Sequence, residues 1–355
     1  MSDATECAVH AGRRPETITA AAIREALLGP SDSEGGLFRD ADRVRREKVG
    51  DEVHLRGLIE FANYCRCACV YCGLRAGNAE VRRYRMSREE ILGAARLAKR
   101  LGYGTVVLQS GEDGGLELPL VTGVVRSIKQ KLGLAVTLSM GELTEREYAA
   151  LREAGADRYL LKHETSNPVL FRKLRPGLEI ENRLACVRTL RALGFQVGGG
   201  CMVGLPGQTV DDMVGDLLLL RELDIDMAGI GPFIPCPGTP LWGDAGTWPR
   251  DARIRATYRM MALLRLVCPE AMIPVTTALA TLDPEARRLG LQRGANVIMP
   301  NVGDIARRRD YVIYPGKAGL GKTADVAHEE LMALLRSLSR RPGEGPGHRR
   351  RGEGG

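Results

Sequence analysis

Eight apolar segments with the character of β-strands alternate with helical segments along most of this chain. Short strands alternating with helices of about 10–15 residues are typical of a parallel sheet with right-handed crossovers. The expected strands are Val53–Phe61, Thr105–Gln109, Leu134–Ser139, Arg158–His163, Gln196–Val203, Met227–Gly231, Met272–Thr277 and Asn296–Met299. Eight such units predict an α/β fold of the (β/α)8, TIM-type barrel kind.

Helical segments fill the intervals between these strands, and two of them begin with capping boxes. Ser87 with Glu90, and Thr144 with Glu147, have the S/T-x-x-E spacing. The expected helices are Glu89–Leu101, Leu118–Leu132, Thr144–Ala154, Glu181–Leu193, Val210–Leu223, Asp251–Val267, Pro284–Gln292 and Ala324–Ser337, with Ile18–Leu28 and Leu37–Val49 packed outside or beneath the barrel.

We therefore expect four parts in this chain. A helical extension spans 1–50, the barrel 51–320, and a C-terminal helix 321–341. The last part, 342–355, is basic and rich in glycine and proline, and such a composition predicts disorder.

Composition restricts the classes of function. The chain has 355 residues and a net charge of +7, part of which lies in the tail. No apolar run is long enough for a transmembrane helix and the N-terminus lacks a signal-peptide core, so we expect no membrane contact and a cytoplasmic, thiol-reducing location. With five Phe and two Trp, an aromatic surface for stacking nucleic-acid bases is not expected.

One loop of the predicted barrel carries closely spaced cysteines. Cys65, Cys69 and Cys72 follow the first expected strand in a C-x3-C-x2-C pattern. A cubic iron–sulfur cluster normally takes four thiolates, so three would leave one iron open to a reactant. We predict that these three cysteines hold such a cluster, and we interpret Cys67 as a bystander because both spacings close without it.

The cysteine loop is also compatible with alternatives to such a cluster. Structural zinc is four-coordinate, so a zinc knuckle would need Cys67 as a further ligand crowded onto one extended stretch. A disulfide framework is disfavoured by the odd number of cysteines, nine, and by the lack of a secretory signal. A non-catalytic iron–sulfur or zinc protein that binds RNA through its basic tail is an alternative from another functional class.

Polar residues collect where the expected strands end. In barrels of this kind the chemistry lies at the C-terminal ends of the strands. Besides the cysteine loop, these positions are Gln109–Asp113, Thr137 with Ser139, Lys162–Thr165, and Thr276 with Thr277. A core strand has no packing reason to end in Lys-His-Glu-Thr, so we expect the functional site at this rim.

Several residues at the rim have both a functional interpretation and a plainer structural one. Gly111 allows a close backbone approach to a ligand, although an ordinary turn would also use it. Glu164 offers acceptors for two ribose hydroxyls. Lys162 and Arg183 are cations available to carboxylates, although an arginine early in a helix is usually exposed. Thr276 and Thr277 offer hydroxyls to an anionic substrate, although threonine in a strand often reflects propensity alone.

With these residues in view, the cysteine loop, with Tyr71 before its last cysteine, resembles that of the radical S-adenosylmethionine (SAM) superfamily. A wider set of segments, from about Leu58 to about Lys317, is similar to the [FeFe]-hydrogenase maturase HydE family. The segments that carry this resemblance are Tyr71–Arg75, Arg83–Met86, Val107–Asp113, His163–Pro168, Lys173–Pro176, Met202–Thr209, Gly229–Pro235, Gly294–Asn301 and Tyr314–Lys317.

The resemblance implies a task for each matching position. Cys65, Cys69 and Cys72 would hold one [4Fe-4S] cluster. Cofactor-binding positions around SAM would be Tyr71, Ser110, Gly111, Glu112, Ser139, Glu164, Arg183 and Met227. Substrate-binding positions would be Thr137, Lys162, Thr276, Thr277, Tyr311 and Tyr314, with the two tyrosines closing the lower part of the cavity.

The resemblance also implies an activity and partners. Reductive cleavage of SAM would give a 5′-deoxyadenosyl radical that acts on a small cysteine-containing iron complex with CO and cyanide, a precursor of the hydrogenase di-iron subcluster. The complex would come from the other hydrogenase maturases, and a low-potential donor would supply the electron. A related radical SAM enzyme, of the methylornithine synthase or biotin synthase type, is the alternative.

Two departures from the family pattern stand out. Some family members carry a second cluster late in the chain, but the last cysteine here is Cys268, so no second cluster is predicted. Lys162 stands where an arginine is expected; lysine keeps the charge but loses the bidentate fork.

Overall fold

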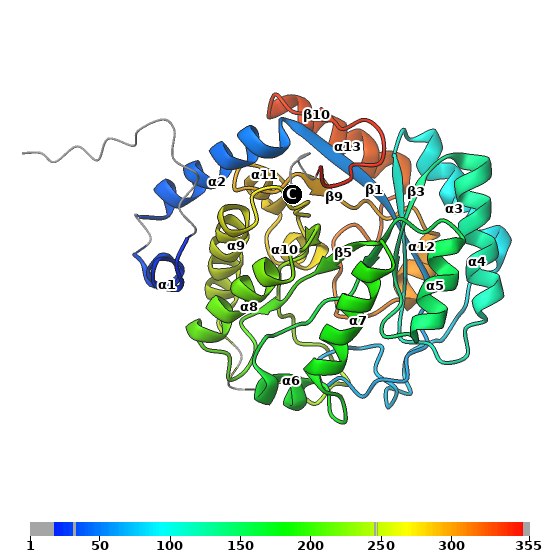
Figure 1. Cartoon of the computed structure of the whole chain (residues 1–355), viewed down its shortest axis with the longest axis horizontal. Helices are drawn as coiled ribbons and strands as arrows, with labels where there is room; N and C mark the ends of the chain where they lie inside the picture. The colour runs from blue at the N-terminus through cyan, green and yellow to red at the C-terminus, as the bar shows by residue number, and fades with distance from the viewer. Residues whose placement is uncertain (1–17, 31–32, 245, 247, 351–355) are drawn as a thin grey trace, which may run out of the picture.

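The computed structural model describes residues 18–30, 33–244, 246 and 248–350, and within them a ring of parallel strands is enclosed by helices (Figure 1). The strands of the ring are β1 (Glu52–Ala62), β2 (Thr105–Ser110), β3 (Ala135–Ser139), β4 (Arg158–Leu160), β5 (Gln196–Gly199), β7 (Met227–Ala228) and β9 (Val297–Ile298). Shorter pieces are β6 (Met202–Val203), β8 (Gly231–Pro232) and β10 (Arg341–Pro342).

The parallel pairings run around a complete circle. β1, β2, β3, β4, β5 and β7 pair in that order. Met272 then bridges Met227, Pro274 bridges Val297, and β9 returns to β1 through His54 and Leu55. The predicted (β/α)8 barrel is therefore confirmed, although the seventh strand is reduced to isolated bridges.

Two of the expected strands are each divided in the structure. The segments Gln196–Val203 and Met227–Gly231 each divide, into β5 and β6 and into β7 and β8, and β6 pairs with β8 in a ladder of its own. The break falls at Gly200, where φ is +149° and an added Cβ would lie 2.1 Å from the carbonyl oxygen of Gly229. This close backbone approach is available to glycine alone, and it bends the chain away from the ring.

Helices cover the outside of the ring. They are α1 (Ala20–Leu28), α2 (Glu34–Val49), α3 (Arg88–Arg100), α4 (Leu118–Ser127), α5 (Glu145–Glu153), α6 (Pro168–Leu174), α7 (Ile180–Ala192), α8 (Val210–Glu222), α9 (Arg250–Val267), α10 (Thr277–Leu282), α11 (Ala286–Leu291), α12 (Ile305–Asp310) and α13 (Ala324–Ser337). A short π-helix, η2 (Ile128–Leu132), extends α4. The capping boxes expected at Ser87 and Thr144 are both present. The short helices α6, α10 and α12 were not predicted from the sequence.

The two N-terminal helices lie on the outside of the barrel, where α2 contacts α9 and α1 contacts α8. Their apolar residues join the core that fills the space between the sheet and its helices. No helix in the described part of the chain is long and apolar enough to span a membrane.

The prediction of disorder for 342–355 is wrong for residues 342–350. β10 pairs in parallel with the start of β1, Glu52 opposite Arg341 and Val53 opposite Pro342. Beyond it the chain contacts Thr105, Arg158 and Gln196, the first residues of β2, β4 and β5. Composition predicted a solvated chain, but its backbone carbonyls accept hydrogen bonds from buried arginines of the barrel. Residues 351–355 lie outside the described residues.

Candidate functional site

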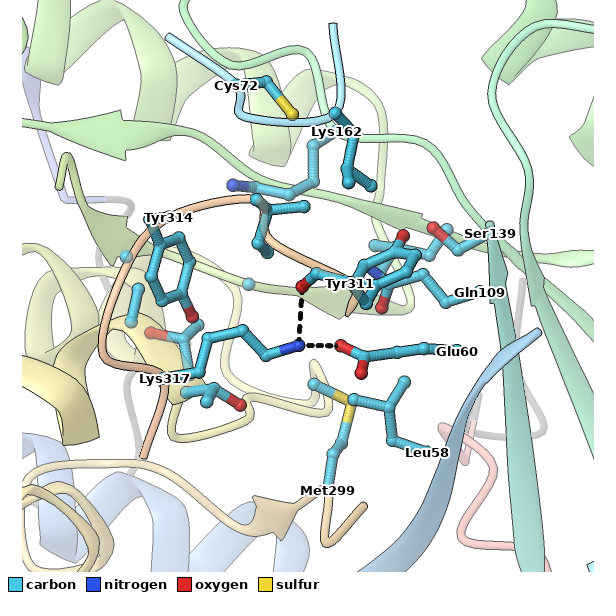
Figure 2. Close-up of a pocket in the computed structure, with 18 of the residues that line it drawn as sticks. Leu58, Glu60, Cys72, Gln109, Ser139, Lys162, Met299, Tyr311, Tyr314 and Lys317 are labelled. Atoms are coloured by element: carbon cyan, nitrogen blue, oxygen red, sulfur yellow. Dashed lines mark hydrogen bonds and ion pairs between the residues drawn. The ribbon is translucent and has the colours of Figure 1, made fainter. Parts of the chain in front are cut away.

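A cavity of about 380 Å³ occupies the interior of the barrel and reaches the loop that carries the cysteines. Figure 2 shows Cys72 and Lys162 at one end, Tyr311 and Tyr314 beside the middle, and Leu58 and Met299 at the other end. Lining residues come from β1 to β4, from β7 and β8, and from the segments after β9. The cavity therefore lies where a barrel of this kind places its functional site, inside the ring and toward the carboxyl ends of the strands.

The cysteine loop is held in shape by Arg83. Its guanidinium donates hydrogen bonds to four loop carbonyls, at distances of 2.6 Å to Asn63, 2.9 Å to Leu74, 2.9 Å to Arg75 and 3.2 Å to Asn78. Arginine suits this task because its planar fork presents several donors in fixed directions. The loop is thus ordered by the protein itself.

Four cysteine side chains of this loop line the cavity: Cys65, Cys67, Cys69 and Cys72. Burial raises the pKa of Cys72 to about 12, and Cys65 has a raised pKa because of its hydrogen bond with Cys67 and its burial. A metal would deprotonate such thiols outright, so the donor chemistry fits a thiolate-bound iron–sulfur cluster. Among the described residues no three Cys, His, Asp or Glu side chains are arranged to hold a single metal ion. In a cubic cluster each thiolate binds a different iron, so the thiols need not converge on one point.

Glu112 lies between two arginines at the rim of the cavity. Its Oε1 lies 2.7 Å from one nitrogen of Arg175 and 2.7 Å from one nitrogen of Arg183. Arg183 also pairs with Glu142 at 2.9 Å. Burial alone would raise the pKa of Glu112, but the two guanidinium groups outweigh it and lower the pKa to about 2. Arg183 is 3% exposed, so an exposed position early in α7 is excluded for it.

Two glycines allow the backbone to close around this carboxylate. Gly141 has φ of +81°, and an added Cβ would lie 1.8 Å from Cγ of Glu112. An added Cβ at Gly111 would lie 2.2 Å from the carbonyl oxygen of Tyr64 and 2.8 Å from Cβ of Cys65. The segment after β2 is therefore packed directly on the cysteine loop, a contact that a larger residue at position 111 would prevent.

Lys162 and Glu164 form an ion pair of 3.1 Å beside the cysteine loop. Burial would raise the pKa of Glu164, but Lys162, together with Arg183 and Arg175, outweighs burial and lowers the pKa. Glu164 has φ of +67°, which a non-glycine residue rarely adopts. Hydrogen bonds to Gly200 and from Met202 hold this backbone in place. Strained residues held in this way gather at functional sites, which agrees with the position of Glu164 in the cavity wall.

A buried ion pair crosses the middle of the cavity. Nζ of Lys317 lies 2.5 Å from Oε1 of Glu60, and it also donates to the carbonyl of Tyr311 at 3.1 Å (Figure 2). The other carboxylate oxygen of Glu60 accepts from Asn301 at 2.9 Å. Glu60 is 4% exposed and Lys317 8%, so neither charge is stabilised by bulk water. The pair fastens the segment with Tyr311 and Tyr314 to the barrel wall.

Most of the remaining predicted residues also line the cavity. These are Tyr71, Ser110, Ser139, Met227, Thr276, Thr277, Tyr311 and Tyr314. Met227 lies at the Arg56 end, where its sulfur accepts a hydrogen bond of 3.2 Å from that arginine. The hydroxyl of Thr276 is engaged in capping α10, since it accepts from the backbone of Leu279 and donates to Ile230.

Thr137 is placed differently from the prediction. Its side chain is buried against Arg158, whose guanidinium donates to its hydroxyl at 3.3 Å, and it is not among the described residues that line the cavity. Thr137 precedes Ser139 by two residues on β3, which is about 7 Å along a strand. Ser139 faces the cavity, whereas Thr137 lies nearer the start of the strands.

The sequence reasoning missed the roles of Glu60, Arg175 and Lys317. Glu60 was counted within an apolar run, although a carboxylate in a buried strand requires a partner. Arg175 and Lys317 lie in segments that carry the family resemblance, but no contact could be assigned to them from the sequence. These contacts join residues that are distant in the sequence; Arg175 and Glu112, for example, are 63 residues apart.

Comparison with known proteins agrees with this geometry. Residues 59–220 match the family model of the radical SAM superfamily. Over 330 residues the chain is 49% identical to the [FeFe] hydrogenase maturase subunit HydE of Thermotoga maritima, and the match covers 93% of each chain. This chain belongs to the HydE family of radical SAM enzymes. Its membership implies a [4Fe-4S] cluster and SAM, in agreement with the buried thiols at the mouth of the cavity.

More distant relatives share the HydE-family fold. The 3-methylornithine synthase of Methanosarcina barkeri is 32% identical over 77% of this chain and 76% of its own length. The crystal structure of a methylornithine synthase superposes with a TM-score of 0.76 at 25% identity, covering 92% of this chain and 94% of that one. A crystal structure of HydG, a maturase of the [FeFe]-hydrogenase, has a TM-score of 0.76 at 18% identity, with 92% and 72% covered, and supports the fold alone.

Proposed function

We propose that this protein acts in maturation of the [FeFe]-hydrogenase active site, on a small cysteine-containing iron complex with CO and cyanide. The observation that carries the proposal is the 49% identity with the HydE of Thermotoga maritima over nearly the whole of both chains. The other maturases would supply the complex, and a low-potential donor in the cytoplasm would supply the electron.

Cys65, Cys69 and Cys72 would hold a single [4Fe-4S] cluster, with Cys67 outside the ligand set. Bound cluster and SAM would together supply a 5′-deoxyadenosyl radical by one-electron cleavage of SAM. SAM would be bound at the same end of the cavity by Tyr71, Ser110, Gly111, Glu112, Ser139, Glu164 and Arg183, and farther inside by Met227. The position of Glu164 in the cavity wall supports this assignment, because its carboxylate offers acceptors to the two ribose hydroxyls of SAM.

The protein's own contribution is to position the reactants and exclude water. Glu112 is fixed by two guanidinium groups before any ligand arrives, so the rim needs little reorganisation on binding. Tyr311 and Tyr314 line the cavity farther from the cysteine loop, where they would enclose the substrate together with Lys162, Thr276 and Thr277. An enclosed cavity suits a radical reaction, because water and stray hydrogen donors are kept away.

An anaerobic maturation assay tests the proposal. The reconstituted protein replaces HydE in a mixture of the other maturases and apo-hydrogenase, and hydrogen evolution is measured with and without SAM. SAM-dependent hydrogen evolution is expected. SAM cleavage to 5′-deoxyadenosine without active hydrogenase would instead favour the second candidate, a methylornithine synthase-like or biotin synthase-like enzyme. The 32% identity with a 3-methylornithine synthase supports this candidate.

A further inference from the structure

The C-terminal segment Arg341–Arg350 lies across the N-terminal ends of the barrel strands, opposite the cysteine loop. Gly343 donates its backbone N–H to Val53 near the start of β1 at 2.9 Å. The carbonyl of Pro346 accepts from Thr105, the first residue of β2, at 2.9 Å, and also from Arg158, the first residue of β4. The segment thus passes from one strand to the next around the lower mouth of the ring.

Arg349 continues the same path beyond Pro346. Its backbone exchanges hydrogen bonds with the side chain of Gln196, the first residue of β5, at 3.1 and 3.3 Å. Its guanidinium lies 2.5 Å from Asp224, which shortly precedes β7, and 3.4 Å from Glu270, which precedes the Met272 bridge. Backbone and side-chain contacts therefore fasten this end of the chain at several separate strands.

Two buried arginines of the barrel receive further acceptors from this segment. Arg56, which lines the cavity, donates to the carbonyl of Gly347 at 3.0 Å, and Arg158 contacts the ring of His348 at 2.9 Å. Arg56 is 2% exposed and Arg158 1%. Buried guanidinium groups without acceptors would be costly, so the segment stabilises them where they are.

We infer that Arg341–Arg350 is the floor of the reaction chamber: it closes the N-terminal mouth of the barrel and positions Arg56 at the lower end of the cavity. Arg56 acts here as a positioned residue of the chamber wall, and the segment acts through it. The inference extends the proposed function, because a radical enzyme requires a chamber closed at both ends, but the closure itself can be tested without activity.

Gly104 provides a specific way to displace the floor. An alanine Cβ at this position would lie 1.7 Å from the carbonyl oxygen of Gly345, a backbone atom that can move away only with its segment. Gly93 offers a matched control in the preceding helix α3, because an added Cβ there meets nothing closer than 4.0 Å. Gly104→Ala is therefore expected to release the segment, and Gly93→Ala to leave it seated.

The first measurement is hydrogen exchange of the reconstituted holoenzyme, followed by mass spectrometry of the peptides from 341–350. We expect exchange in the unaltered chain and in Gly93→Ala to be at least tenfold slower than in an unstructured reference peptide, and this protection to be lost in Gly104→Ala. Free exchange of these peptides in the unaltered chain would overturn the inference. In a chain ending at Arg340 the segment is absent, so Gly104→Ala should not lower the midpoint of thermal unfolding further. If Gly104→Ala lowers the midpoint as much in that shortened chain as in the full chain, the inference is wrong.

The second measurement compares SAM cleavage with hydrogenase activation in the same variants. Release of the floor is expected to leave 5′-deoxyadenosine formation within about twofold of the unaltered chain while hydrogenase activation falls at least tenfold. Unchanged activation in Gly104→Ala and in the chain ending at Arg340 would refute the role of the segment in the chamber. If the unaltered chain fails to activate hydrogenase, the proposed function fails, and the exchange experiment still decides whether the floor exists.

Discussion

The buried ion pair of Glu60 and Lys317 gives a prediction whose size follows from the structure. Lys317→Met removes the cation and leaves a carboxylate that is 4% exposed, with Asn301 as its remaining hydrogen-bond donor among the described residues. Breaking a buried pair on one side typically costs about 3–5 kcal/mol, because the remaining charge stays desolvated. The double variant Glu60→Gln with Lys317→Met keeps an acceptor for Asn301 and buries no charge. The double variant should therefore regain most of the free energy of unfolding that Lys317→Met loses.

Urea unfolding of the four proteins of this double-mutant cycle measures the coupling between the two residues. Lys322→Met is a matched control: Lys322 pairs with Glu330 at 2.6 Å, but these side chains are 49% and 46% exposed. Exposed pairs contribute about 0–1 kcal/mol, so this variant should unfold nearly as the unaltered chain does. A loss for Lys317→Met no larger than that for Lys322→Met would show that the carboxylate finds water or a proton, and the reasoning from burial would be refuted.

Three further predictions concern the mouth of the cavity. Cys69→Ala should abolish both the bound iron and SAM cleavage, whereas Cys67→Ala should spare both; iron analysis and quantified 5′-deoxyadenosine decide, and loss of the cluster in Cys67→Ala would contradict the ligand assignment. The pKa of Glu112 is lowered from 4.5 to about 2, so its contribution to stability is present above pH 4.5 and disappears as the pH falls toward 2. At about 1.36 kcal/mol per pKa unit, this contribution amounts to about 3 kcal/mol. Glu112→Gln should therefore flatten the pH dependence of urea unfolding between pH 4.5 and pH 2. Gly141→Ala should weaken SAM binding in equilibrium dialysis at least tenfold, because its Cβ would displace Glu112; unchanged binding would remove Glu112 from the SAM site.

The barrel could be predicted from the sequence because its signals are local. Alternation of strand and helix, and capping boxes at Ser87 and Thr144, depend on neighbouring residues alone. The two predicted strands that divide in the structure contain glycines that permit close contact with a distant backbone, as Gly200 does with Gly229. Such a contact is not visible in either segment by itself, so the predicted strands continued through it.

The site was predictable in part for the same reason. The cysteine loop and the polar strand ends are compact motifs, and the structure brings nearly all of them to one cavity. Thr137 was misplaced because alternation along β3 does not tell how far below the rim a residue lies. The order of 342–350 was missed because glycine and proline composition describes the segment without its partners, Arg56 and Arg158, which stand far earlier in the chain.

The buried charges of this barrel are distributed in three levels, and each is compensated by the protein. Glu112 is held by Arg175 and Arg183 beside the cysteine loop, Glu60 by Lys317 in the middle, and Arg56 by the carbonyl of Gly347 at the floor. A ligand entering such a cavity meets a field that is already organised, so little rearrangement is needed when charge develops during a reaction. Since these three groups of side chains have separate hydrogen-bond and ion-pair partners, a change at the floor should alter substrate handling and leave SAM cleavage intact. Changes around Glu112 should alter SAM cleavage and leave substrate handling intact. This difference would distinguish residues of the chamber wall from residues of the cofactor site.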